Sequence, residues 1–282
     1  MTQAPAQRSI QPSPTTQSPI KLKHKAMWAF GNYDTVATEV VGGLGPVIVG
    51  AAGVGPGQRV LDVAAGSGNA SIPAAERGAR VTASDLTPEL LDIGEQRSQE
   101  KGLDVRWLEA DAEFLPFGDG EFDTVLSCVG VMFAPFHQPV ADELTRVTRS
   151  GGTIALVNWT PEGFIGRMFK IMKEFVPAPP PGAQPGPLWG AENHVRELFG
   201  DRVTELQAQR RELTVDRFAN AEHFRDYFKE FYGPTIAAYR NIADDPAREA
   251  ALDRALVELA RAAGADTGTM QWEYLLVTAR RV

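Results

Sequence analysis

The chain of 282 residues has one cysteine, no cluster of basic residues and no long apolar run, and each absence excludes a class of protein. Cys128 alone forms no disulfide within the chain, which is typical of a reducing compartment, so we expect a cytoplasmic protein. The formal net charge of −8, without a Lys/Arg-rich run, argues against a nucleic-acid partner. No apolar stretch reaches bilayer-spanning length and the N-terminus has no signal-like region, so we expect no membrane partner.

Composition divides the chain into three parts. Residues 1–20 are dominated by Gln, Pro, Ser and Thr, which bury too little apolar surface to offset the entropy of ordering, so we expect a disordered tail. Residues 21–58 mix basic and aromatic residues with a helical apolar pattern, and we expect lid helices there. Residues 59–282 are numerous enough to bury a full α/β core.

Between residues 60 and 160, strand-like and helix-like segments alternate. Such alternation requires crossover connections and a buried parallel sheet with helices on both faces. The predicted fold class is therefore α/β, a doubly wound, Rossmann-like, seven-stranded and mostly parallel sheet with helical insertions. We expect strands at 59–63, 80–85, 105–109, 122–127, 153–159, 203–215 and 271–279, and helices at 69–77, 88–101 and 137–149.

The first predicted strand ends in a turn of small residues, Asp62-Val-Ala-Ala-Gly-Ser-Gly68. Small residues let backbone N–H groups approach a ligand closely. A dinucleotide fingerprint requires glycine where this chain has Ala64, Gly66 and Asn69, and only one of the three fits. A nicotinamide-dependent oxidoreductase is therefore the less favoured alternative, and no Walker loop is present.

The same turn resembles motif I of the class I S-adenosylmethionine (SAM)-dependent methyltransferases, in which an acidic residue precedes Gly-x-Gly-x-Gly. Alanine replaces the first glycine, which costs little if that position has a negative φ. The resemblance implies SAM as the cofactor and S-adenosylhomocysteine (SAH) as the product. Cofactor contacts are then expected from the acid and from the turn, at Asp62, Ala64, Ala65, Gly66 and Gly68. Asp62 has a second interpretation, as a residue that only braces the loop.

Two further acids follow predicted strands. Asp85 ends the second strand, where nucleotide-binding folds place the acid that binds ribose hydroxyls, and Leu86 comes next. A helix N-cap before Pro88 is a compatible interpretation of Asp85. Asp111 and Ala112 follow the third strand and resemble the family motif that contacts the adenine amino group. With Phe-Asp-Thr-Val in the fourth strand and Arg-Ser-Gly-Gly before the fifth, the resemblance covers roughly residues 55 to 160.

The reacting methyl group requires an aligned acceptor, and a base helps when that acceptor is a hydroxyl or an acidic C–H. His137, just after the fourth strand, is the candidate base. The alternative interpretation is that His137 only begins a helix and has a partly exposed imidazole. His24 and His223 are weaker candidates because they lie in predicted lid segments.

By resemblance, Tyr33 closes over the amino-acid end of the cofactor, and Cys128 or Val129 offers backbone groups there. No compact His/Asp/Glu cluster suggests a metal, so we expect no metal requirement.

Two C-terminal segments, roughly 163–200 and 217–265, are expected to form a substrate cap. The second is rich in aromatic residues, most of which we expect to pack the helices while two or three reach an apolar acceptor. A Pro-rich stretch at 177–187 is either a spacer or a pocket rim, and Trp189 beside it favours the rim. The aromatic residues are Phe218, Phe224, Tyr227, Phe228, Phe231, Tyr232 and Tyr239.

The sequence therefore predicts a SAM-dependent methyltransferase that modifies oxygen or carbon of an apolar or aromatic small molecule. It resembles the ubiquinone and menaquinone C-methyltransferases, but the long C-terminal cap departs from those compact enzymes and favours a secondary metabolite or another lipophilic acceptor. A non-catalytic SAM-binding module remains an alternative beside the oxidoreductase. The sequence leaves open whether the chain forms a homo-oligomer.

Overall fold

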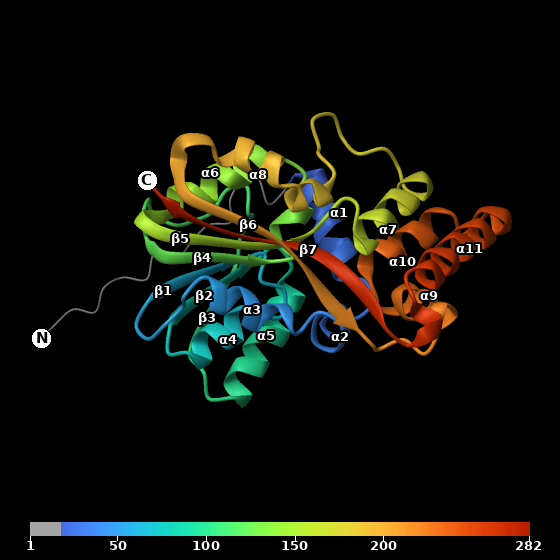
Figure 1. Cartoon of the computed structure of the whole chain (residues 1–282), viewed down its shortest axis with the longest axis horizontal. Helices are drawn as coiled ribbons and strands as arrows, with labels where there is room; N and C mark the ends of the chain where they lie inside the picture. The colour runs from blue at the N-terminus through green and yellow to red at the C-terminus, as the bar shows by residue number, and fades with distance from the viewer. Residues whose placement is uncertain (1–17) are drawn as a thin grey trace, which may run out of the picture.

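A twisted seven-stranded sheet organises the chain in the computed structural model, which describes residues 18–282 (Figure 1). The strand order is β3-β2-β1-β4-β5-β7-β6. The strands are β1 (Arg59–Val63), β2 (Arg80–Asp85), β3 (Val105–Glu109), β4 (Phe122–Cys128), β5 (Thr148–Trp159), β6 (Val203–Val215) and β7 (Met270–Arg281).

Strands β1 to β5 pair in parallel, and β7 pairs antiparallel with both β5 and β6. The central strand β1 is buried on both faces after its first residue, as a near-continuous apolar run in a parallel sheet should be. Because parallel strands end at the same edge, the carboxyl ends of β1, β2, β3 and β4 meet there. The predicted fold class is confirmed.

Helices cover both faces of this sheet, and a further group lies beyond one end of the long strands β6 and β7 (Figure 1). Helices α4 and α5 lie on one side, whereas α6 and α8 lie on the other. The helices are α1 (Pro19–Trp28), α2 (Tyr33–Glu39), α3 (Leu44–Ala51), α4 (Ser71–Glu76), α5 (Pro88–Glu100), α6 (His137–Val147), α7 (Phe164–Met172), α8 (Glu192–Phe199), α9 (Ala221–Phe231), α10 (Gly233–Asn241) and α11 (Pro246–Ala262).

The observed boundaries depart from the predicted ones where local hydrogen bonds compete with periodicity. Most of the tail predicted at 1–20 lies outside the described residues, but Ser18 caps α1 and Pro19 begins it, so helix starts inside that range. Strand β5 begins five residues earlier than predicted, because Thr148 pairs with Phe122 before a register shift. Helix α4 begins at Ser71, later than predicted, and before it the Asn69 side chain donates to Ala37 O.

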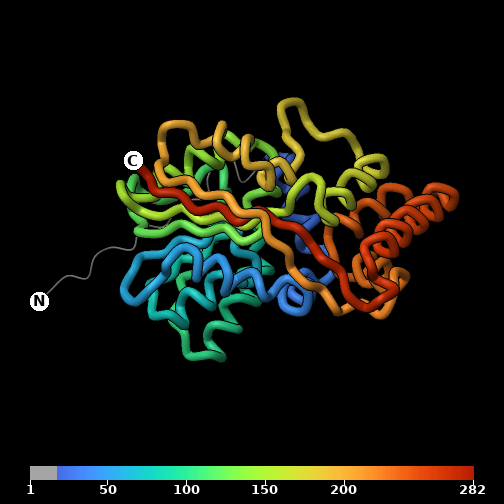
Figure 2. Tube along the Cα trace, in the orientation of Figure 1, coloured from blue at the N-terminus to red at the C-terminus, as the bar shows by residue number. Residues whose placement is uncertain are grey.

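The C-terminal aromatic residues mostly form a core of their own. Phe224 packs within 5.1 Å, centroid to centroid, of Phe164 on α7 and within 4.5 Å of Phe228 on α9, and Phe164 stacks on Trp272 of β7. This aromatic core attaches helices α7, α9 and α11 to the end of the sheet, on the right in Figures 1 and 2.

The Pro-rich stretch at 177–187 runs outward from the body as a long loop (Figure 2). Trp189 follows it in a short 3-10 turn, η4 (Gly186–Gly190), and is fully buried. The expectation that Trp189 forms a pocket rim is wrong, because its ring packs 5.4 Å from His137 and 6.3 Å from Phe199 in the interior.

Replacing Phe224 with alanine tests the aromatic core. We expect the free energy of unfolding to fall by about 3–5 kcal/mol, because the side chain is fully buried among rings that cannot collapse into the cavity. Phe114, which is 53% exposed, provides the matched control. Denaturant unfolding of both Phe→Ala variants measures the difference, and equal losses would contradict the proposed core.

Candidate functional site

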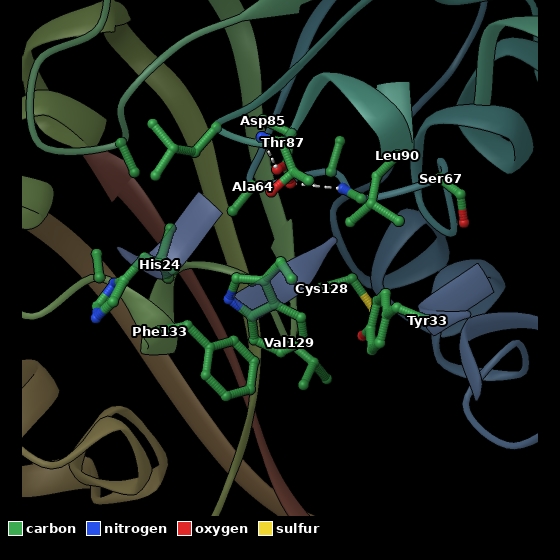
Figure 3. A pocket seen from close by; sticks show the side chains of 18 of the residues that line it. His24, Tyr33, Ala64, Ser67, Asp85, Thr87, Leu90, Cys128, Val129 and Phe133 are labelled. Carbon is green, nitrogen blue, oxygen red and sulfur yellow. Dashed lines mark hydrogen bonds between the residues drawn. The ribbon is translucent and has the colours of Figure 1, made fainter. Parts of the chain in front are cut away.

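A cleft opens at the carboxyl edge of the sheet, where β1, β2, β3 and β4 end (Figure 3). Its empty volume is about 810 Å³, which includes space open to solvent. The N-terminal helices α1 and α2 and the 3-10 turn η2 (Val131–Phe133) complete its walls. Figure 3 shows His24 and Tyr33 on opposite sides of this cleft.

The turn after β1 carries backbone conformations that favour glycine. Gly66 and Gly68 have φ of +56° and +94°, and a Cβ on Gly68 would lie 2.7 Å from the Trp107 ring. Ala64 has φ of +54°, so the condition under which its departure from the motif costs little is not met. A left-handed alanine costs about 1–2 kcal/mol, so the chain holds this turn in a strained conformation.

Asp85 joins this turn to the next helix. One carboxylate oxygen accepts a hydrogen bond from Gly66 N at 2.9 Å, and the other accepts from Thr87 N at 2.8 Å, just before α5. The N-cap of α5 is Thr87 and not Asp85, which corrects the capping interpretation. Burial raises the pKa of Asp85 against the opposing effect of these hydrogen bonds.

Asp111 carries an unpaired acceptor. Its Oδ1 accepts from Lys21 Nζ at 2.8 Å and from Glu113 N at 3.0 Å. Within the described part of the chain its Oδ2 has no hydrogen-bond partner, although the side chain is only 2% exposed. A buried carboxylate oxygen without a donor is costly, so this atom is suited to a ligand that donates.

Asp62 lies beneath the turn and outside the cleft lining. Its Oδ2 accepts from the Ser71 hydroxyl at 2.6 Å, which ties β1 to α4 and agrees with the bracing interpretation. Burial raises the pKa of Asp62 to about 7. Its Oδ1 has no partner in the structure.

Tyr33, Cys128 and Val129 meet at the opposite side of the cleft from His24 (Figure 3). Burial raises the pKa of both the Tyr33 hydroxyl and the Cys128 thiol, so both stay protonated near neutral pH. Val129 has φ of +54°, an outlier for a β-branched residue, while its N–H donates to Val157 O. Strain of this kind often gathers where a fold must present its backbone to a ligand.

The structure brings most of the predicted cofactor residues together in one cleft lining. Gly68 and Asp62 are the exceptions and lie outside the lining. The predicted residues in the lining are Tyr33, Ala64, Ala65, Gly66, Asp85, Leu86, Asp111, Ala112 and Cys128.

His137 lies away from this cleft, contrary to the expected place of a base. It is fully buried at the start of α6, where its Nδ1 lies 2.9 Å from His194 Nε2. Burial, with a smaller effect of His194, lowers the pKa of His137 to about 4. The partly exposed alternative is also wrong, since α8 and Trp189 cover the ring.

Helix α1 and turn η2 contribute aromatic and basic side chains to the cleft that were not predicted from the sequence. Lys21, Trp28 and Phe133 line the cleft, together with the weaker candidate His24. The only signal was the alternation of bases and aromatics near residues 21–34. His223 lies outside the lining, on α9, and accepts a hydrogen bond from Ala219 N. None of the seven C-terminal aromatic residues lines the cleft.

Comparison with known proteins identifies the family. A methyltransferase domain model matches residues 61–156. An uncharacterised protein of Mycobacterium tuberculosis is 53% identical over 270 residues, which cover 96% of this chain and 98% of that protein. The demethylmenaquinone methyltransferase of Thermus thermophilus is 36% identical over 118 residues, which cover 40% of this chain and 54% of that enzyme. Residues 61–156 of this chain therefore form a methyltransferase domain.

The fold of the methyltransferase agrees with a solved structure of the same architecture. A geranyl diphosphate methyltransferase in complex with SAM superimposes with a TM-score of 0.54 at 19% identity, covering 86% of this chain and 85% of that one. The turn after β1 lies within the matched methyltransferase domain, which favours a methyltransferase over a nicotinamide-dependent oxidoreductase. SAM is the cofactor bound in that solved structure.

The residues of the cleft fit that cofactor. The unpaired Asp111 Oδ2 offers an acceptor for an amino group, and the turn at Gly66 brings backbone close to the cleft without a side chain. Within residues 18–282, no group of three or more His, Cys, Asp or Glu is arranged to hold a metal ion. No helix in that range is both long and apolar enough to cross a membrane.

Replacing Asp85 with alanine tests the cofactor cleft of the methyltransferase. We expect SAH to bind about 1–3 kcal/mol more weakly, because charge-assisted hydrogen bonds are lost. Isothermal titration calorimetry measures the change, and Asp92→Ala on the exposed side of α5 is the control. Unchanged affinity in Asp85→Ala would contradict the predicted contact with the ribose.

The buried His137 predicts a pH-dependent stability. Its folded-state pKa of about 4 lies below the ordinary value of 6.5, so the unfolded chain binds a proton first as the pH falls. The fold therefore loses stability between about pH 6.5 and 4, by on the order of 2–3 kcal/mol from this group.

Denaturant unfolding of the parent and of His137→Phe at pH 7 and pH 4.5 measures this contribution. The difference between the two proteins in how their free energy of unfolding changes with pH isolates His137. The raised pKa of Asp62 changes stability in the opposite direction, but equally in both proteins. Equal pH dependence in the two proteins would show that His137 is not held neutral by the fold.

Proposed function

We propose that this methyltransferase transfers the methyl group of SAM to oxygen or carbon of an apolar or aromatic small molecule. One observation carries the proposal: Trp28, Tyr33 and Phe133 line the same cleft as Asp85 and Asp111. The carboxylates in one part of the cleft can accept hydrogen bonds from the nucleoside of the cofactor. The aromatic surface is left for the molecule that receives the methyl group.

The polar residues support an orientation for the cofactor. Asp85 lies where it accepts from ribose hydroxyls, and Asp111 with the Ala112 backbone receives the adenine, beside Leu86. The turn at Ala64, Ala65 and Gly66 faces the amino-acid end, which Tyr33 covers: its ring would lie 3.6 Å from a Cβ placed on Gly66. Gly68 and Asp62 support this turn from behind and do not touch the ligand.

Catalysis then depends on alignment and on exclusion of water. The cofactor supplies a sulfonium methyl group that is already activated for transfer to a nucleophile. Tyr33 and Cys128 do not serve as bases near neutral pH because both remain protonated. His137 is withdrawn as the base because α6 buries it away from the cleft. The residues of the cleft hold the acceptor against the methyl group and keep the site dry.

The cap supports an apolar acceptor by fixing the aromatic wall from outside. Trp28 packs 5.9 Å from Tyr232 of the cap, and Phe133 packs 5.9 Å from Phe169 on α7. The T. thermophilus relative is named for demethylmenaquinone, which supports a lipophilic ring as acceptor here. A secondary metabolite of this kind, methylated in the cytoplasm where Cys128 stays reduced, fits these features.

Methyl transfer from radiolabelled SAM tests the proposal. We expect label in organic-soluble products from alkylated phenols and quinols, and none from polar acceptors of similar ring size. Phe133→Ala should raise the acceptor KM about tenfold with little change in the SAM KM, because about 1–2 kcal/mol of apolar contact is lost.

Phe114→Ala serves as the control, since that ring is exposed and outside the lining. SAH binding without transfer to any acceptor would support the non-catalytic module instead. A Phe133→Ala variant with parental acceptor kinetics would contradict the assignment of the aromatic wall.

A further inference from the structure

Helix α1 places a buried cation against the residue expected to recognise adenine. Lys21 is 4% exposed, and its Nζ lies 2.8 Å from Asp111 Oδ1 and 2.7 Å from Glu113 Oε2. Both carboxylates are themselves nearly buried, at 2% and 9% side-chain exposure. One cation is thus shared between two acids at the wall of the cleft.

The hydrogen bonds of this cluster leave one acceptor open. Glu113 Oε1 accepts from Phe136 N at 3.1 Å, and Glu113 Oε2 pairs with Lys21. Asp111 Oδ1 accepts from Lys21 and from Glu113 N. Of the four carboxylate oxygens, only Asp111 Oδ2 has no partner among residues 18–282. An ionised carboxylate accepts and never donates, so this oxygen selects a ligand that offers N–H.

Lys21 supplies the positive charge that both acids face. Two carboxylates that share a buried site without a cation take up a proton, because like charges at short range disfavour the doubly ionised form. A protonated Asp111 would also donate, and the site would then accept a carbonyl as readily as an amino group. His24 on the same helix does not replace the cation, since burial and Lys21 lower its pKa.

We propose that Lys21 is a positioning residue that commits Asp111 to the acceptor role and thereby selects a 6-amino over a 6-oxo purine in the cofactor. The inference rests on the proposed orientation of the cofactor. The proposal assigns a role in cofactor recognition to Lys21, which lies on α1 before the first strand and outside the motifs at the strand ends.

The chain offers a matched control on the same helix. Lys25, one turn further along α1, pairs with Glu109 of β3 at 2.8 Å. That pair also attaches α1 to the sheet, but it is partly exposed and does not touch Asp111. Lys25→Met therefore weakens the attachment of the helix without changing the carboxylate pair.

The experiment is calorimetric titration of SAH and of its 6-oxo counterpart, S-inosylhomocysteine, into the parent, Lys21→Met, Lys21→Arg and Lys25→Met. We expect the parent to bind SAH roughly 100-fold or more tightly than the 6-oxo ligand. Lys21→Met should lower this ratio by about tenfold or more, while Lys21→Arg and Lys25→Met keep it within about twofold. The ratio is independent of the folded fraction of each sample.

Three results would overturn the inference. The first is a parental ratio in Lys21→Met, and the second is an equal fall in Lys25→Met, which would indicate attachment of the helix only. The third is loss of binding of both ligands in Lys21→Met that Lys21→Arg does not restore. If the parent itself fails to bind SAH, the proposed orientation of the cofactor fails as well, so the two failures are distinguishable.

Discussion

The two hydrogen bonds that Asp85 accepts hold the cleft together. Through them the strained turn after β1 and the start of α5 bind the same buried carboxylate. The ends of the adjacent strands β1 and β2 therefore form a single surface. The remaining walls depend on that surface. Tyr33 covers the turn from α2, and Arg97 of α5 donates to Asp34 Oδ1 at 2.8 Å and so anchors α2 beside it.

Helix α1 closes the cleft by two chemically different contacts. Lys21 pairs with the two carboxylates that follow β3. Trp28, at the other end of the helix, packs against the rings of Tyr33, Phe133 and Tyr232. One helix thus touches both the nucleoside side and the acceptor side of the site. This helix carries none of the family motifs.

Local pattern predicted much of this architecture and little of its cap. Strand β1 and the acid that ends β2 are marked by apolar runs and by a polar residue at the strand end, which depend only on the local sequence. His137 shows the limit, because its distance along the chain from β4 said nothing about whether α6 would turn it toward the cleft or inward. Trp189 was misplaced for the same reason, since burial depends on which distant helices cover a ring.

The sequence by itself determined the sheet, the turn after β1 and the acids Asp85 and Asp111, because strand periodicity and turn chemistry are encoded in neighbouring residues. Tertiary structure decided the left-handed conformation of Ala64, the burial of His137 and the pairing of Lys21 with Asp111. Those features arise from contacts between segments far apart in the chain, up to 90 residues for Lys21 and Asp111, and no local pattern specifies them.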